Sequence, residues 1–269
     1  MIDYHTHTDA SGDGCTPVHE MIQGAVDMGV EEICITSHYD ADYPLAPDLD
    51  FDIDAQAYAA DVLAAQKAYA GRIRVKLGIE VGMMAGRAQT FSKIRQKLNG
   101  IPFDFIIGSC HYVEGPDFHK PPAWRSGITR QQVCETYLRT LLACMEEYDD
   151  FNVLGHITYY SRYNPHADRE MRYADAPDAF DTLFKALIQR GKGIEINTSV
   201  QDKMGFFCPD YDIVRRYREL GGEIITIGSD AHVPQRICAN YQAACAMLKR
   251  AGFEAICTFD QRKPSFVRI

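Results

Sequence analysis

Short runs of apolar and β-branched residues recur roughly every thirty to forty positions, and longer segments with helical spacing separate them. This alternation of strand and helix is typical of a parallel sheet surrounded by helices. The predicted strands cover residues 1–5, 31–37, 74–81, 103–109, 152–156, 193–197 and 223–229, with 255–259 as a candidate eighth strand. The pattern predicts an α/β barrel, and 269 residues suffice for a single domain spanning 1–269.

One long stretch, residues 112–127, shows no helix or strand pattern and contains three prolines and the only tryptophan, Trp124. Loops of this length often form lids over active sites. An ordinary surface loop fits the same composition, so both interpretations stay open.

Composition excludes several classes of protein. A formal charge of −9 argues against nucleic acid as a main partner, because backbone binding needs clustered Lys and Arg. The first residues lack the basic patch and apolar stretch of a signal peptide, and no apolar run approaches the roughly 20 residues of a membrane span. Nine cysteines, an odd number, are scattered singly. We therefore expect a cytoplasmic protein with reduced cysteines and no membrane association.

Histidines and acids gather at the carboxyl ends of the predicted strands. In a parallel barrel these ends open onto one face, where such enzymes place their active sites. Six of the nine histidines occupy these positions, together with three acidic residues. The full set is His5, His7, His38, Glu80, His111, His156, Glu195, Asp230 and His232.

This combination of imidazole and carboxylate predicts a metal site. Both groups bind zinc, manganese or iron, and a carboxylate can bridge two ions. Any single histidine is more often a structural residue, but so many at equivalent positions are hard to explain by packing. Divalent ions would also offset the negative charge of the chain and favour an anionic substrate.

Motifs around these residues resemble those of the PHP (polymerase and histidinol phosphatase) domain family, in particular its histidinol-phosphate phosphatase branch. The likeness runs from the first residues to Arg262-Lys263-Pro264 and so covers nearly the whole chain. The matching segments are His5-Thr6-His7-Thr8, Ser11 with Asp13-Gly14, Thr36-Ser37-His38, Gly78-Ile79-Glu80, Gly108-Ser109-Cys110-His111-Tyr112, Leu154-Gly155-His156, Glu195-Ile196-Asn197-Thr198 and Gly228-Ser229-Asp230-Ala231-His232.

The resemblance implies a distorted (β/α)7 TIM-like barrel that holds up to three divalent metal ions, zinc, manganese or iron. The implied ligands are His5, His7, Glu80 and Asp230 for the first ion, Glu80, His111 and His156 for the second, and His38, His232 and Asp13 for the third. Asp13 is preferred over Asp9 because many family members place a ligand at that position. The role of Glu195 stays open.

The resemblance also implies the hydrolysis of a small phosphate monoester, L-histidinol phosphate, to L-histidinol and phosphate. A hydroxide bridging the first two ions would attack phosphorus in line while the ions neutralise the phosphoryl oxygens. Asp230 or His232 would then pass a proton to the departing alkoxide.

Phosphate monoesters usually bind Arg or Lys at the mouth of a site, and Arg162 and Lys203 are the best placed after the fifth and sixth strands. A solvated surface charge is an equally consistent interpretation of each. Relatives carry a Leu-Arg-like step after the Glu-x-Asn-Thr segment, where this chain has Ser199-Val200-Gln201-Asp202-Lys203. This departure leaves the phosphate contacts open.

Three alternatives remain. Another PHP phosphoesterase, acting on nucleotides or a different small phosphate, would share the metal site and differ only at its rim. An amidohydrolase-type deacylase also uses His-x-His on a barrel, but its bridging residue is commonly a modified lysine, where this chain has Glu80. A catalytically silent metal-binding module is disfavoured because the ligand set is complete. The sequence leaves the oligomeric state open.

Overall fold

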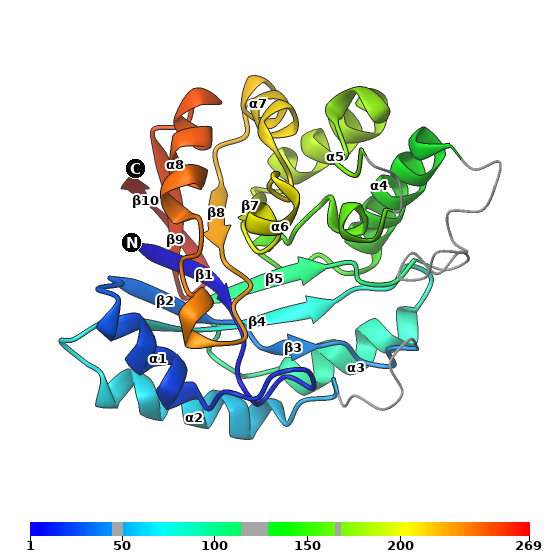
Figure 1. The fold of residues 1–269 in the computed structure, drawn as a ribbon. Helices are drawn as coiled ribbons and strands as arrows, with labels where there is room; N and C mark the ends of the chain where they lie inside the picture. Colours follow the sequence, from blue (N-terminus) through cyan, green and yellow to red (C-terminus); the bar gives the residue numbers. More distant parts are fainter. Residues whose placement is uncertain (45–50, 114–128, 165–167) are drawn as a thin grey trace.

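The computed structural model describes residues 1–44, 51–113, 129–164 and 168–269 (Figure 1). The segment 112–127, for which a lid and an ordinary surface loop were both open, lies outside these ranges from residue 114 onward. Among the described residues, no helix is long and apolar enough to cross a membrane. All nine cysteines are unpaired, and Cys15 alone among them is exposed.

Seven strands form one parallel sheet in the order β1-β2-β4-β5-β6-β7-β8. Their bounds are β1 Ile2–Thr6, β2 Glu32–Ile35, β4 Arg74–Gly82, β5 Phe105–Ser109, β6 Val153–Leu154, β7 Gly193–Asn197 and β8 Ile225–Gly228. The two outer strands approach each other, since the amide of Asp230 donates to the carbonyl of His5 at 2.8 Å. The sheet is therefore a nearly closed barrel, and the predicted (β/α)7 architecture is confirmed.

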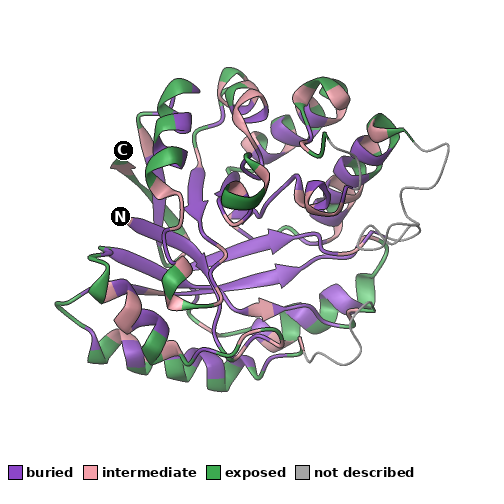
Figure 2. Ribbon diagram, in the orientation of Figure 1, coloured by how far each residue is buried: buried purple, intermediate pink, exposed green. Residues whose placement is uncertain are grey.

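Helices cover the outside of this barrel (Figure 1). The longer ones are α1 Val18–Asp27, α2 Ala55–Ala68, α3 Ala88–Leu98, α4 Arg130–Glu147, α5 Pro177–Gln189, α7 Tyr211–Glu219 and α8 Tyr241–Arg250, and shorter turns are α6 Gln201–Met204, η2 Tyr159–Tyr163, η3 Tyr173–Asp175 and η4 Pro234–Arg236. The apolar side chains of α5 recur at helical spacing, with Phe180, Leu183, Phe184 and Leu187 all buried. Figure 2 shows the result, with buried strands inside and exposed positions on the outer faces of the helices.

The structure differs from the predicted strands at two places. The second predicted strand, 31–37, is shorter in the structure, where β2 ends at Ile35, and a separate two-residue strand that was not predicted, β3 His38–Tyr39, follows it and pairs with β4. The candidate eighth strand exists as β9 Ala255–Asp260 but lies outside the barrel, because it pairs antiparallel with β10 Lys263–Arg268. Left-handed backbone at Gln261 and Arg262 makes the tight turn that folds these strands into a hairpin.

Candidate metal centre

The six strand-end histidines meet at the carboxyl-terminal mouth of the barrel. Three groups of potential ligand atoms each lie within 4.8 Å of one another. The groups are His5, His7 and Glu80; His38, Glu80 and His111; and His7, His38 and His232. The groups share members, so the described residues form one continuous cluster rather than three separate sites.

His5 and His7 stand two residues apart at the end of β1. Side chains two positions apart in a strand point to the same face, so both rings turn toward one side. Both lie buried in the cluster, with their ring centroids 5.0 Å apart. The pairing of β1 with β2 also shifts register between Asp3 and Thr6.

Glu80, which lies within β4 and is fully buried, occupies the centre of the cluster. Its Oε1 lies 2.9 Å from Nε2 of His156 and 3.2 Å from Nε2 of His111. Its Oε2 lies 3.1 Å from Nε2 of His5 and 3.0 Å from Nδ1 of His38. The two oxygens therefore face different histidines, which is the arrangement of a carboxylate that bridges two ions.

Asp230 follows β8 and divides its oxygens in a similar way. Oδ1 lies 3.2 Å from Nε2 of His7 and 3.9 Å from Nε2 of His5. Oδ2 accepts a hydrogen bond from Arg162 at 2.8 Å. The structure thus brings Asp230 together with the ligand set predicted for the first ion.

Asp13 is the first-loop acid that lies beside the remaining histidines. Its Oδ2 is 3.2 Å from Nε2 of His232 and 3.7 Å from Nε2 of His38. Asp9 is exposed, and its backbone amide donates to the carbonyl of Thr16. The geometry therefore favours Asp13 over Asp9 as the acid of the third set.

The charges of the cluster fit bound cations. Burial alone would raise the pKa of Glu80, but neighbouring His5 and His38 hold the pKa well below its usual value. Burial opposes ionisation of Asp230 as well, and His5 and Arg162 keep its pKa well below the ordinary value. Burial, helped by the charge of His38, lowers the pKa of His7 to about 3, so its ring is neutral near pH 7. Ionised carboxylates and neutral imidazoles are the forms that ligate metal.

Unpartnered atoms point to the same conclusion. His5 Nε2, His7 Nε2 and Glu80 Oε2 are buried and make no hydrogen bond within the described part of the chain. Such atoms are rare in folded proteins because leaving them unpaired costs about 1–3 kcal/mol each. A divalent ion would satisfy all three, so the residues present fit the metal centre that the sequence predicts.

Two acids that are not themselves predicted metal ligands contact ring nitrogens of the histidines, and the sequence analysis missed one of them. Asp40 Oδ1 lies 2.7 Å from Nδ1 of His111, and Asp40 Oδ2 lies 3.3 Å from Nδ1 of His38. Glu195, whose role was open, places Oε1 at 2.6 Å from Nδ1 of His5. The only sequence signal for Asp40 was its position two residues after His38 at a strand end.

The two predicted substrate-binding cations differ in their placement. Arg162, on η2, donates from Nη2 to Asn197 and Ser199 as well as to Asp230. Its guanidinium lies 5.0 Å from the ring centroid of Tyr159, and its Nε is buried with no hydrogen-bond partner among the described residues. Lys203 lies on α6 with an exposed side chain. The structure thus brings Arg162, but not Lys203, into direct contact with the cluster.

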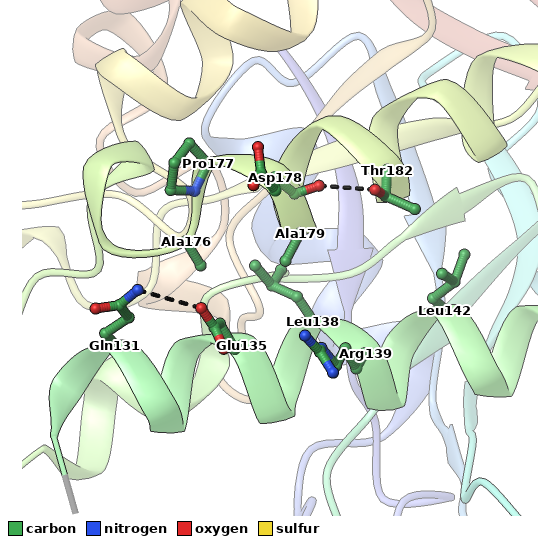
Figure 3. Close-up of a pocket in the computed structure, with 10 residues that line it drawn as sticks. All are labelled: Gln131, Glu135, Leu138, Arg139, Leu142, Ala176, Pro177, Asp178, Ala179 and Thr182. Carbon is green, nitrogen blue, oxygen red and sulfur yellow. Dashed lines mark hydrogen bonds between the residues drawn. The ribbon is translucent and has the colours of Figure 1, made fainter.

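A separate cavity of about 430 Å³ lies on the outer surface between α4 and α5 (Figure 3). Leu138 and Leu142 form part of its apolar wall, and Glu135 and Asp178 lie at its edge. Among the described residues that line it there is neither histidine nor cysteine, so these residues offer none of the chemistry of the histidine cluster.

Comparisons with known proteins agree with this geometry. A family model described as the PHP domain matches residues 3–199. A probable histidinol-phosphatase of Clostridium acetobutylicum is 32% identical, over 97% of this chain and 98% of the relative. The crystal structure of histidinol phosphate phosphatase from Lactococcus lactis, complexed with zinc, L-histidinol and phosphate, is 28% identical and superposes with a TM-score of 0.87 over 98% of both chains.

Proposed function

Because the chain belongs to the PHP domain family, we propose that it is a metal-dependent phosphomonoesterase that hydrolyses L-histidinol phosphate to L-histidinol and phosphate. One observation carries the proposal: every ligand position implied by the family resemblance is filled, and the side chains converge on one mouth of the barrel. The relative from Lactococcus lactis, with which the chain shares its fold over 98% of its length, was crystallised with L-histidinol and phosphate.

We assign three ligand sets within one domain spanning residues 1–269. The first is His5, His7, Glu80 and Asp230, the second is Glu80, His111 and His156, and the third is His38, His232 and Asp13. The division between the first and second sets follows the two oxygens of Glu80, since Oε2 faces His5 while Oε1 faces His111 and His156. Oε2 also lies 3.0 Å from Nδ1 of His38, a member of the third set.

When bound, divalent ions of zinc, manganese or iron supply positive charge for the phosphoryl oxygens and lower the pKa of water near phosphorus. The chain's own residues supply binding and orientation. Arg162 contacts the cluster through Asp230 and has a buried Nε with no hydrogen-bond partner among the described residues, and a guanidinium is well suited to bind a phosphoryl group. Its bonds to Asn197 and Ser199 fix its position, which reduces the entropy lost on substrate binding.

The departing alkoxide needs a proton, and Asp230 and His232 are the groups proposed to supply it. His232 is partly exposed at the rim, and its Nδ1 lies 3.1 Å from the carbonyl oxygen of Asp230. Burial would lower the pKa of His232, but Asp13 and Asp230 raise it, which favours the protonated ring. The ring would serve as the general acid only while it holds this proton and is not bound to the third ion, because a ligating imidazole is neutral.

The test is phosphate release from L-histidinol phosphate by protein reconstituted with manganese or zinc. Chelator-stripped protein serves as the control, and a panel of nucleotides and sugar phosphates tests specificity. We expect metal-dependent turnover with strong preference for L-histidinol phosphate. Turnover of nucleotides or other monoesters, but not of L-histidinol phosphate, would mean that the chain is a PHP phosphoesterase with a different substrate. Absence of turnover on every ester would refute phosphatase activity.

A further inference from the structure

Glu195, on β7, is a buried carboxylate that contacts two different ligand sets. Its exposed fraction is 1%. Oε1 lies 2.6 Å from Nδ1 of His5, which belongs to the first set. Oε2 accepts a hydrogen bond at 2.8 Å from the backbone amide of His156, which belongs to the second set.

The backbone around Glu195 is shaped to admit its carboxylate. A Cβ at Gly228 would lie 2.2 Å from Oε1 of Glu195 and 2.3 Å from Cβ of His5. A Cβ at Gly155 would lie 3.5 Å from Oε2 of Glu195 and 2.4 Å from Oγ of Ser109. Glycine at position 228 therefore lets Glu195 and His5 approach closely at the mouth of the barrel.

The contact with His156 restrains an unusual backbone conformation. His156 has a φ of 26°, in the left-handed region that a residue with a side chain rarely adopts. Such conformations persist where surrounding structure holds them in place. The hydrogen bond from the amide of His156 to Glu195 supplies part of this restraint, and it aims the Nε2 of His156 at Glu80.

We propose that Glu195 is a positioning residue that sets the metal affinity of the first two ligand sets, by orienting the ring of His5 and the backbone of His156. The inference rests on the proposed metal centre and adds to it a residue that is not itself a ligand. Carboxylates behind ligating histidines fix the tautomer and the ring orientation, and their loss typically lowers metal affinity roughly 10- to 100-fold.

Glu195 also controls which nitrogen of His5 carries the ring proton. A metal bound at Nε2 of His5 requires the ring proton on Nδ1, and Oε1 of Glu195 accepts that proton's hydrogen bond. Three donors converge on the carboxylate: His5, the amide of His156, and the side-chain amide of Asn197 at 3.4 Å. Glutamine has a single acceptor oxygen, so its NH2 must face one of these donors. An NH2 group that faced His5 would donate to Nδ1. The ring proton would then sit on Nε2, the nitrogen that binds the metal.

The experiment is a titration of chelator-stripped Glu195→Gln protein with Zn²⁺ against a chromogenic chelator, with the visible spectrum of the Co²⁺-substituted protein as a second readout. We expect affinity for the tightest ion to fall roughly 10- to 100-fold, with a changed Co²⁺ spectrum. Glu32→Gln is the matched control. Glu32 is equally buried but lies on β2, where it bonds to Tyr4 and Arg74 rather than to histidine. We expect this variant to bind Zn²⁺ like the wild type.

Glu195→Asp keeps the negative charge but is one methylene too short to reach both His5 and His156, so it should also weaken binding. If Glu195→Gln does not fold, the Zn²⁺ titration and the Co²⁺ spectrum are measured on Glu195→Asp instead. Wild-type Zn²⁺ affinity and an unchanged Co²⁺ spectrum in a folded Glu195 variant would overturn the inference. Wild-type protein that binds Zn²⁺ but does not hydrolyse L-histidinol phosphate would overturn the proposed function alone. Wild-type protein that binds no divalent metal would overturn both.

Discussion

Nη2 of Arg162 lies 2.8 Å from Oδ2 of Asp230, so a predicted phosphate-binding arginine is joined directly to a predicted metal ligand. The other oxygen of Asp230 faces His7 at 3.2 Å. The arginine therefore orients Asp230 toward the histidines, and its buried Nε has no hydrogen-bond partner among the described residues. If Arg162 binds phosphate as proposed, this pair links substrate binding to metal binding.

Replacing Arg162 with lysine should raise KM for L-histidinol phosphate more than it lowers kcat. Lysine keeps the charge but cannot bond to Asn197, Ser199 and Asp230 in the same geometry. Loss of a hydrogen bond to a charged group costs about 1.5–3 kcal/mol, which corresponds to roughly a 10- to 100-fold decrease in kcat/KM. Steady-state kinetics at saturating metal measure the effect.

Lys203→Met provides the comparison for this prediction. Lys203 is exposed on α6, and a solvated charge at that position would change kcat/KM by less than Arg162→Lys does. A larger effect at Lys203 than at Arg162 would assign the phosphate contact to the lysine instead.

His111→Ala should abolish turnover while leaving the barrel folded. His111 faces Glu80 with Nε2 and Asp40 with Nδ1, so its removal takes a ligand from the second set. Losing a metal ion from such a centre costs several kcal/mol of transition-state stabilisation, on the order of a thousandfold in rate. Elemental analysis should find fewer metal ions per chain, and circular dichroism should find an unchanged fold.

His19→Ala is the control for this variant, because His19 is an exposed residue of α1. It should retain full metal content and full activity. Activity retained by His111→Ala at wild-type metal content would contradict the assignment of the second set.

The metal-free protein should lose stability as pH rises above the ordinary histidine range. Burial disfavours protonation of His5 and His111, but the carboxylates beside them raise the pKa of both well above 6.5. A folded-state pKa above the unfolded value contributes stability that is complete below pH 6.5 and is lost as pH rises through the folded-state pKa. Thermal unfolding of chelator-stripped protein between pH 6 and pH 9 measures this trend.

Added Zn²⁺ should oppose the trend, because the same histidines must release their protons to bind metal and affinity therefore rises with pH. His7, whose pKa lies near 3, releases no proton in this range. A metal-free protein whose melting temperature rises between pH 6.5 and pH 9 would contradict the assigned protonation of His5 and His111.

Gly82→Ala should weaken metal binding through Asp40. A Cβ at Gly82 would lie 1.9 Å from Oδ1 of Asp40, the oxygen that contacts His111, so the carboxylate must move. Loss of a carboxylate that contacts a ligating histidine typically lowers metal affinity roughly 10- to 100-fold. Zinc titration measures the effect.

Gly100→Ala is the control for a general loss of stability, which would occur there without any displacement of Asp40. Gly100 has a φ of 79° and open space around its Cβ position, so alanine there costs about 1–2 kcal/mol of stability from the left-handed backbone alone. Its metal affinity should match that of the wild type. Equal metal affinities in the two variants would show that Asp40 does not control His111.

Sequence reasoning predicted the barrel because strand and helix periodicities are local properties of the chain. It also predicted a strand at 255–259, which exists as β9, but it left open whether this strand joins the barrel, and the next residues fold back to pair with it in a hairpin. Whether a strand joins the barrel depends on which edge is available, and a strand's own pattern does not contain that information. Lys203 was predicted only from its position after a strand, and its place on a short helix left the side chain exposed.

The sequence by itself determined the fold class and the chemistry of the ligands, because the histidines and acids follow strands whose ends must share one face of a parallel barrel. The division into ligand sets came from the family resemblance, and only the tertiary structure showed which atoms orient the ligands. The two directions of the Glu80 oxygens and the contacts of Asp40 and Glu195 join residues that are distant in the chain. The physical reason is that a ligand's orientation depends on the atoms behind it, and closure of the barrel alone brings those atoms into place.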